Sequence, residues 1–457
     1  MVAFRLSSSL TLSSACVLLM ACACAAPASA QSLQALYEAA RAYDATYLGA
    51  RAQADSVVYR AAQADALARP SLGLGVNGTR TEYNLPGYPA TVGQQVVMIP
   101  GGRQGLTNWQ GGLNASYALY NRSNNLTIDQ AKRGLESAQA DLESAEQDLI
   151  VRVAQAYFDV LAAQDTLATS RANKAAIAEQ LAAAQRNFEV GTATITDTRE
   201  AQARADLAIA QELAADNDLR VKRVALDQIV GRVGVEPKPL ALPVALPALP
   251  SNNVDTWLAQ AEATHPLIRK AQLALEVAKL ESEKSRAAGE VTLALTGTVG
   301  GQYQSGEAAA TPGTTTSASV GVSLNYPIYA GGAIENRLKE TVKLEDKSRD
   351  DLDFARRSVE QATRQAFFGV QSLEAQVKAY EAAESSTKLA LDATLLGYKV
   401  GVRVNIDVLN AQTQLYTTES NLARARYDVL VNGLKLRQAA GLLRPDDVTA
   451  VNQLLVR

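Results

Sequence analysis

The sequence has few of the residues from which catalytic and metal sites are built. It contains one histidine, His265, and three cysteines, Cys16, Cys22 and Cys24. A protein-bound zinc ion needs three or four such ligands held together, so we expect neither a metal nor a cofactor. No glycine-rich segment leads into the Lys-Ser/Thr pair of a phosphate-binding loop. The composition therefore predicts a protein that is not an enzyme.

The sequence also lacks a large excess of either positive or negative charge. The 44 Lys and Arg residues nearly balance the 47 Asp and Glu residues, which gives a formal net charge of −3 at pH 7. The chain has no long basic run, and nucleic-acid binding depends on such a basic surface. We expect no nucleic-acid partner.

Aromatic residues and long hydrophobic runs are also scarce. Aromatic residues make up 5% of the chain, which together with abundant alanine favours long, tightly packed helices. Beyond residue 30, no apolar run approaches the roughly 18 residues of a membrane-spanning helix. If the protein enters a membrane, we expect it to do so as strands.

The first 30 residues have the features of a secretory signal peptide. A single charge, Arg5, precedes an apolar run, and Ala28-Ser29-Ala30 matches the small-x-small pattern of a cleavage site. We expect residues 1–30 to be removed and the chain to leave the cytoplasm. Leu19-Met20-Ala21-Cys22 also fits a bacterial lipidation box, so acylation of Cys22 is the alternative.

The rest of the chain repeats one plan of about 200 residues. When the sequence is aligned with itself at an offset of 210 residues, Val190-Gly191 matches Val400-Gly401 and Asp197 matches Asp407. The proline-rich segment 237–250 joins the two copies. We predict a first repeat over residues 31–240 and a second over 241–457, each with a helix, two strands and a long helical hairpin.

Four segments alternate between apolar and polar residues, which is typical of strands with two different faces. They are residues 71–83, 107–119, 291–304 and 316–328. Each has about 13 residues, enough to cross a bilayer at a tilt. The glycine- and threonine-rich segments between them, 84–105 and 305–315, are expected to be loops.

Heptad patterns predict long helices between the strands. In the first copy, Ile128, Leu135, Leu142 and Leu149 recur every seven residues with alanine three places later, which is typical of closely approaching coiled coils. The second copy repeats the pattern over residues 352–373 and 415–436. We expect antiparallel helical hairpins with a helix on the order of 100 Å long.

Strands of this kind cannot leave their edges open in lipid, because each unpaired backbone group there costs several kcal/mol. Four strands are too few for a barrel. Two chains would give eight strands, whose interior side chains fill, whereas three chains would give twelve and an open lumen. We infer a trimer that shares one barrel.

Three motifs are specific in sequence and order: VGxxxxxDVLxAQ at residues 400–412, the turn PIYAGG at 327–332, and the helical opening at 33–42. Together with the duplicated layout, they resemble the TolC family of outer membrane efflux and secretion ducts. The resemblance implies a mixed α and β channel-tunnel: a trimer with a shared 12-stranded transmembrane β-barrel and a long antiparallel coiled-coil α-helical barrel in the periplasm. The linker and the C-terminal tail would form its equatorial region.

The resemblance also implies location and partners. The protein would be a passive duct in the outer membrane of a Gram-negative bacterium, for efflux of small molecules, type I protein secretion, or both. Its partners would be outer membrane lipid, a periplasmic adaptor protein, and an inner-membrane pump or ABC exporter. A soluble periplasmic scaffold is the alternative; it would use the heptads but not the four strands.

By resemblance, the hairpin tips contain a latch that closes the periplasmic mouth. Arg403 would contact Asp197 and Thr196 of a neighbouring chain, and Tyr398 would hydrogen-bond Asp197 within its own chain. Gln180 belongs to the same set.

The family also lines its pore constriction with two acidic residues per chain. Asp407 matches one of them, whereas Asn410 replaces the other, so weaker attraction of cations is expected. From the residues alone, Asp407 and Asp197 are explained equally well as helix N-caps, and Asp197 with Glu200 as a capping box.

The tips themselves are implied to meet the adaptor. The residues concerned are Val190, Gly191, Val400 and Gly401. Each glycine also suits the end of a helix, where a left-handed residue is needed. Both interpretations can hold together.

Overall fold

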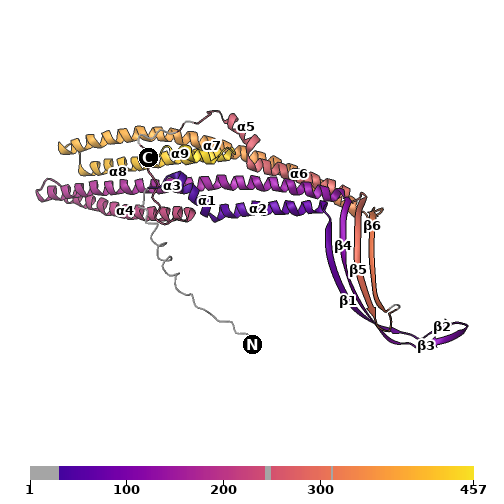
Figure 1. The fold of residues 1–457 in the computed structure, drawn as a ribbon. Helices are drawn as coiled ribbons and strands as arrows, with labels where there is room; N and C mark the ends of the chain where they lie inside the picture. The colour runs from indigo at the N-terminus through magenta and orange to yellow at the C-terminus, as the bar shows by residue number, and fades with distance from the viewer. Residues whose placement is uncertain (1–29, 242–246, 248, 310–311, 457) are drawn as a thin grey trace, which may run out of the picture.

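The computed structural model describes residues 30–241, 247, 249–309 and 312–456. A long helical bundle makes up most of the molecule, and a curved sheet extends from one end of it (Figure 1). Residues 1–29, with the lipidation motif and most of the predicted signal peptide, lie outside the described residues. Within the described ranges, no helix is both long and apolar enough to cross a membrane.

Two helical hairpins form the body of the bundle, one from each half of the chain. The first consists of α3 (Arg122–Glu189) and α4 (Ile195–Val230), and the second of α7 (Ala333–Lys399) and α8 (Asn405–Ala439). With 68 and 67 residues, α3 and α7 are each about 100 Å long. The shorter helices are α1 (Leu33–Tyr43), α2 (Ala45–Asp65), η1 (Ala66–Ala68), α5 (Val254–Thr264), α6 (Pro266–Ala287) and α9 (Pro445–Asn452).

The sheet has four antiparallel strands in the order β1-β4-β5-β6. They are β1 (Ser71–Leu85), β4 (Gly102–Tyr120), β5 (Thr292–Ser305) and β6 (Gly313–Asn325). The four predicted strands are thus confirmed, and two come from each half of the chain. Within one chain, β1 and β6 are the edges of the sheet.

The segment 84–105 is not the simple loop that we expected. It contains a second hairpin of β2 (Tyr88–Val92) and β3 (Gln95–Ile99), joined through the two-residue turn Gly93-Gln94. A Gly-x turn between two short apolar runs is a recognised hairpin signal. Its glycine-rich surroundings concealed that signal.

The heptad prediction for α7 is correct only over its first part. Leu352, Ala355 and Val359 are buried as expected. Further along, the buried positions fall one residue later than expected: Thr363, Phe367 and Val370 in place of Ala362, Ala366 and Gly369. A straight helix with 3.6 residues per turn drifts about 20° per heptad against a 3.5-residue repeat, so one extra residue restores the buried face.

The largest core lies midway along the bundle, where the first hairpin meets α1, α8 and α9. Tyr157 and Phe158 of α3 are fully buried there. The Tyr157 hydroxyl donates to the carbonyl oxygen of Lys238 at 2.9 Å, which ties the start of the proline-rich linker to the helices. Leu240 and Leu455 form a bridge between the linker and the C-terminal tail. The start of the linker and the tail therefore pack at one level of the bundle.

Candidate functional site

The sheet has one apolar face. Because side chains alternate along a strand, residues paired across the four strands share a face. The rows of this face are Leu72, Ala115, Gly297 and Val320; Leu74, Leu113, Val299 and Ala318; Tyr117, Leu295 and Val322. Val320 is 83% exposed and Leu74 is 74% exposed in the single chain. A surface of this kind needs lipid or protein to cover it.

The opposite face, the polar face, carries small and uncharged side chains. Its rows are Gly73, Asn114, Thr298 and Ser319; Gly75, Gly112, Gly300 and Ser317; Asn77, Gln110, Gln302 and Thr315. Thr298 and Ser319 share a hydrogen bond of 2.7 Å across the strands. Such a face suits water, so the sheet separates an aqueous side from an apolar one.

Aromatic residues mark both ends of the apolar face. Trp109 and Tyr303 are paired at the end nearer the β2–β3 hairpin, and Tyr117 and Tyr120 lie at the end nearer the helices. The two levels are eight to eleven positions apart on β4, or about 21–28 Å at a strand tilt of about 40°. That distance fits the apolar band of an outer-membrane barrel, about 25 Å tall between aromatic girdles.

The second candidate site is the pair of hairpin tips, whose turns have the same geometry. Gly191 has φ +79° and Gly401 has φ +81°. In each turn, the residue after the glycine donates its backbone N–H five residues back: Thr192 to Asn187 at 2.8 Å, and Val402 to Gly397 at 2.9 Å. This is a Schellman ending, in which only glycine takes the left-handed position at low cost.

Asp197 and Asp407 are not the N-caps that we considered. Each lies three residues after its cap, and its carboxylate reaches back to the cap N–H: Asp197 to Thr194 at 2.9 Å, and Asp407 to Val404 at 3.4 Å. In the first copy the Thr194 hydroxyl accepts from Asp197 N at 3.2 Å, which completes a capping box. The box thus pairs Asp197 with Thr194, not with Glu200. The Val404 side chain has no hydrogen-bond acceptor, so the second copy has only the bond from the cap N–H to the Asp407 carboxylate.

Within one chain, the predicted latch residues have other partners. Tyr398 Oη accepts from Asn187 Nδ2 at 3.2 Å, in place of the expected bond to Asp197, whose carboxylate is held by Thr194. Arg403 Nη1 lies 3.6 Å from Asp407 Oδ2. Asn187 belongs to the other hairpin of the same chain, whereas Asp407 lies four residues from Arg403. The contacts expected for Arg403 lie on a neighbouring chain. The latch between chains stays a prediction.

The other predicted residues also lie at or near this end of the bundle. Val190 and Val400 are 73% and 65% exposed at the two tips. Thr196 is exposed in the first turn of α4. Among the described residues, no partner is found for the buried Gln180 Oε1. The structure brings the predicted set to one region but does not assign roles within it.

Sequence reasoning missed Arg204. Its Nη2 donates to Asn410 Oδ1 at 3.0 Å and links α4 to α8 near the tips. Nothing in the local sequence couples these positions, which are 206 residues apart. The link gives Asn410 a cation as its neighbour, at a place where a second carboxylate was expected.

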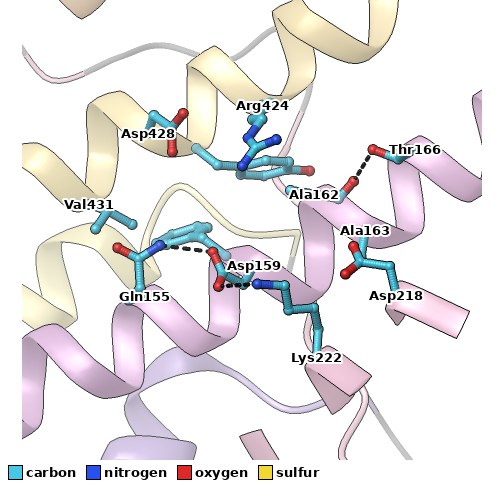
Figure 2. Close-up of a pocket in the computed structure, with 12 residues that line it drawn as sticks. Gln155, Asp159, Ala162, Ala163, Thr166, Asp218, Lys222, Arg424, Asp428 and Val431 are labelled. Atoms are coloured by element: carbon cyan, nitrogen blue, oxygen red, sulfur yellow. Dashed lines mark hydrogen bonds and ion pairs between the residues drawn. The ribbon is translucent and has the colours of Figure 1, made fainter. Parts of the chain in front are cut away.

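A polar cluster where α3, α4 and α8 meet was missed as well (Figure 2). It borders a cavity of about 70 Å³, and Lys222 Nζ lies 3.0 Å from Asp159 Oδ2. Nearby, the Tyr427 hydroxyl donates to Asp165 Oδ2 at 2.6 Å, and burial raises the pKa of Asp165 above its ordinary value. The Tyr427–Asp165 bond fastens the second hairpin to the first, whereas the Lys222–Asp159 pair joins α4 to α3 within the first hairpin.

Neither region resembles a reaction centre. In the part of the chain that the structure describes, no group of three or more His, Cys, Asp or Glu side chains is placed to hold a metal ion. The only histidine, His265, caps α6 by accepting from Leu267 N at 3.1 Å. What the two regions do provide is a two-faced sheet and a pair of matched, exposed helical turns.

Comparison with known proteins gives consistent matches over most of the chain. The sequence profile of the family described as outer membrane efflux protein matches residues 28–232 and 257–442. The outer membrane protein TolC of Vibrio cholerae is 36% identical over 355 residues, which cover 75% of this chain and 78% of that protein. The alkaline protease secretion protein AprF of Pseudomonas aeruginosa is 33% identical over 310 residues, 67% of this chain and 64% of that protein.

A solved structure shows the same fold. The outer membrane protein VceC of Vibrio cholerae superposes with a TM-score of 0.71 at 20% identity, over 90% of this chain and 96% of that chain. The agreement extends over both the helical bundle and the sheet, because a match of this extent leaves neither part out.

Proposed function

The chain belongs to the outer membrane efflux protein family, and from that membership we infer that it is a passive exit duct in a Gram-negative outer membrane. Relatives named outer membrane protein TolC and alkaline protease secretion protein support the proposal that it serves small-molecule efflux, type I protein secretion, or both. The soluble scaffold is not favoured, because it gives no use to a sheet with a broad apolar band on one face.

The two-faced sheet carries this proposal. It presents an apolar band of bilayer height on one side and uncharged polar side chains on the other. Its edges, β1 and β6, must pair with something if the sheet lies in lipid. Three copies would close twelve strands with the apolar faces outward and the polar faces around a water-filled lumen.

We further propose that the helical hairpins extend this duct into the periplasm and that their tips form its entrance. The matched turns at Gly191 and Gly401 would present six similar surfaces in a trimer, which suits docking of a periplasmic adaptor. An inner-membrane pump or exporter would supply the energy. Arg403, Asp197 and Tyr398 would hold the entrance closed, and Asp407 would attract cations to it.

Paired lysine substitutions on opposite faces of β6 test the function. Val320→Lys places a charge on the apolar face, where it costs about 2–4 kcal/mol per chain near the bilayer midplane. Ser317→Lys places the same charge on the polar face. We expect the wild type and Ser317→Lys to be recovered from outer membranes as trimers that form conducting pores in planar bilayers. Val320→Lys should assemble poorly. Equal recovery of both variants, or a monomer that needs no detergent, would contradict the proposal.

A further inference from the structure

The apolar face of the sheet ends abruptly at the rim farthest from the helices. Its last apolar row contains Trp109 and Tyr303. The next positions on the same face are Arg80, Glu82 and Arg103; Arg103 is paired with Asn84. Among the strand residues on this face, Glu82 is the one acidic side chain. The polarity reversal marks the level at which hydrocarbon gives way to headgroups.

This rim faces the outside of the cell if the helices lie in the periplasm. The β2–β3 hairpin projects from it, at the opposite end of the sheet from the bundle (Figure 1). The lipids beside the rim are then those of the outer leaflet.

Neighbouring glycines leave room for the long side chains at the rim to lie along the sheet. The Trp109 ring lies over Gly78, within 2.6–2.9 Å of where a Cβ would stand, so the indole lies against the strand. Arg80 reaches along the face towards the rim, with Nη2 3.9 Å from the corresponding position of Gly105. Arg80 is paired with Thr107, four positions from Arg103 on β4, so the two backbones are about 14 Å apart along the strand. Because Arg80 Nη2 extends to Gly105, it lies only about two positions, or roughly 7 Å, from the level of Arg103.

Arg80 and Arg103 are both exposed. Arg80 lies 3.7 Å from Glu82, and the two side chains are 71% and 63% exposed. Such an exposed pair exchanges readily for a better acceptor. A phosphate is such an acceptor, because its oxygens match the paired N–H donors of arginine.

We propose that Arg80 and Arg103 bind the phosphate of an anionic lipid headgroup in the outer leaflet, with Trp109 and Tyr303 against the top of its acyl chains. The proposal rests on the proposed function, since it needs the apolar face to point towards lipid. Threefold assembly would repeat the site around the barrel and brace the joined sheets with bound lipid.

The test uses the assembled protein in a neutral detergent. Lipid A with two phosphates is added, and the temperature at which the trimer dissociates is followed as a function of lipid concentration. Phosphatidylethanolamine and inorganic phosphate are the comparison ligands. Arg80→Gln with Arg103→Gln is the test variant, and Arg220→Gln with Arg357→Gln, on exposed faces of α4 and α7, is the matched charge control.

We expect lipid A to raise the dissociation temperature of the wild type and the control. The test variant should bind lipid A roughly 25-fold more weakly, about fivefold for each arginine. Each single substitution should show part of this loss, which keeps the test usable if the double variant assembles poorly. Equal response of test and control variants would overturn the lipid site while the channel function stands. An equal response to free phosphate or phosphatidylethanolamine would overturn its assignment to an anionic lipid. Failure of the wild type to form conducting trimers would overturn both proposals.

Discussion

The same helices are packed differently at their midpoint and at their tips. Midway along the bundle, the core contains large side chains, among them Tyr157, Phe158 and Leu161, each no more than 1% exposed. At the tips the core consists mainly of small residues, with Ala184, Ala201, Ala205 and Ala208 beside Ile177 and Leu409. Since apolar burial scales with side-chain size, the midpoint is the more stable part.

Polar groups show the same contrast. At the midpoint, buried hydroxyls have partners, as in Tyr157 with Lys238 and Tyr427 with Asp165. Near the tips, Asn405 is 5% exposed, and neither atom of its amide finds a partner within the described residues. Ile195, its equivalent in the first copy, is 49% exposed. At this pair of equivalent positions, the apolar Ile195 is exposed and the polar Asn405 is buried. Both placements cost stability, so the tips should rearrange more easily than the midpoint.

The largest effect is expected from Phe158→Ala at the midpoint. Removing a fully buried phenylalanine costs about 3–5 kcal/mol, whereas Ile177→Val at the tip should cost about 0.5–1.5 kcal/mol. Dissociation and unfolding temperatures of the purified protein measure both. A Phe158→Ala variant no less stable than Ile177→Val would remove the distinction between the two regions.

Asn405→Leu should stabilise the tips. It replaces an unpartnered buried amide with an apolar group of similar size, and relief of such a group is worth about 1–3 kcal/mol. Hydrogen exchange of the segments around residues 190–200 and 400–410 should slow down, while exchange at the midpoint should stay unchanged. Faster exchange at the tips would show that the Asn405 amide has a partner in the assembled protein.

Arg403→Ser should loosen the entrance by a smaller amount. Partly exposed ion pairs contribute about 1 kcal/mol or less each, and a trimer would lose three of them. We expect a higher conductance in planar bilayers, with Arg199→Ser on the first hairpin as the control. An unchanged conductance would mean that Arg403 does not hold the entrance closed.

The smallest expected effect is a dependence of stability on pH at the midpoint of the bundle. Burial raises the pKa of Asp165, and its bond from Tyr427 opposes this in part. An acid with a raised folded-state pKa stabilises the fold most when protonated, so this contribution declines as pH rises through that pKa. Protection of the amides around Asp165 from hydrogen exchange, measured relative to the intrinsic rate at each pH, should therefore fall as pH rises above the ordinary range of an aspartate, and Asp165→Asn should reduce this fall. A fall that persists unchanged in Asp165→Asn would assign it to another group.

The sequence predicted the parts of the structure that depend on local pattern. The strands from Ser71 to Asn325 follow from alternation, and the buried face of α8, including Leu415, Leu422 and Val429, follows from its heptads. The matched turns at Gly191 and Gly401 could be predicted because the same short motif occurs in both repeats.

What escaped prediction depends on contacts between distant segments. Arg204 and Asn410 approach only after both hairpins have folded, and so do Asp165 and Tyr427. We predicted the N-caps at Asp197 and Asp407, three residues after the true caps at Thr194 and Val404. Aspartate is favoured both as a cap and in the first turn of a helix. Local sequence does not separate those two uses.

Closure of the sheet between copies is the central claim, and a cross-link across the joined edges tests it most directly. From residue 31 onward the chain contains no cysteine, so Leu74→Cys on β1 and Val320→Cys on β6 can be introduced together. Three strand spacings, about 14 Å, separate these edges within one chain. A bis-maleimide shorter than that distance should yield covalent dimers and trimers, with nothing larger. Cross-linking confined to monomers, or an open ladder of longer oligomers, would contradict a closed ring of three.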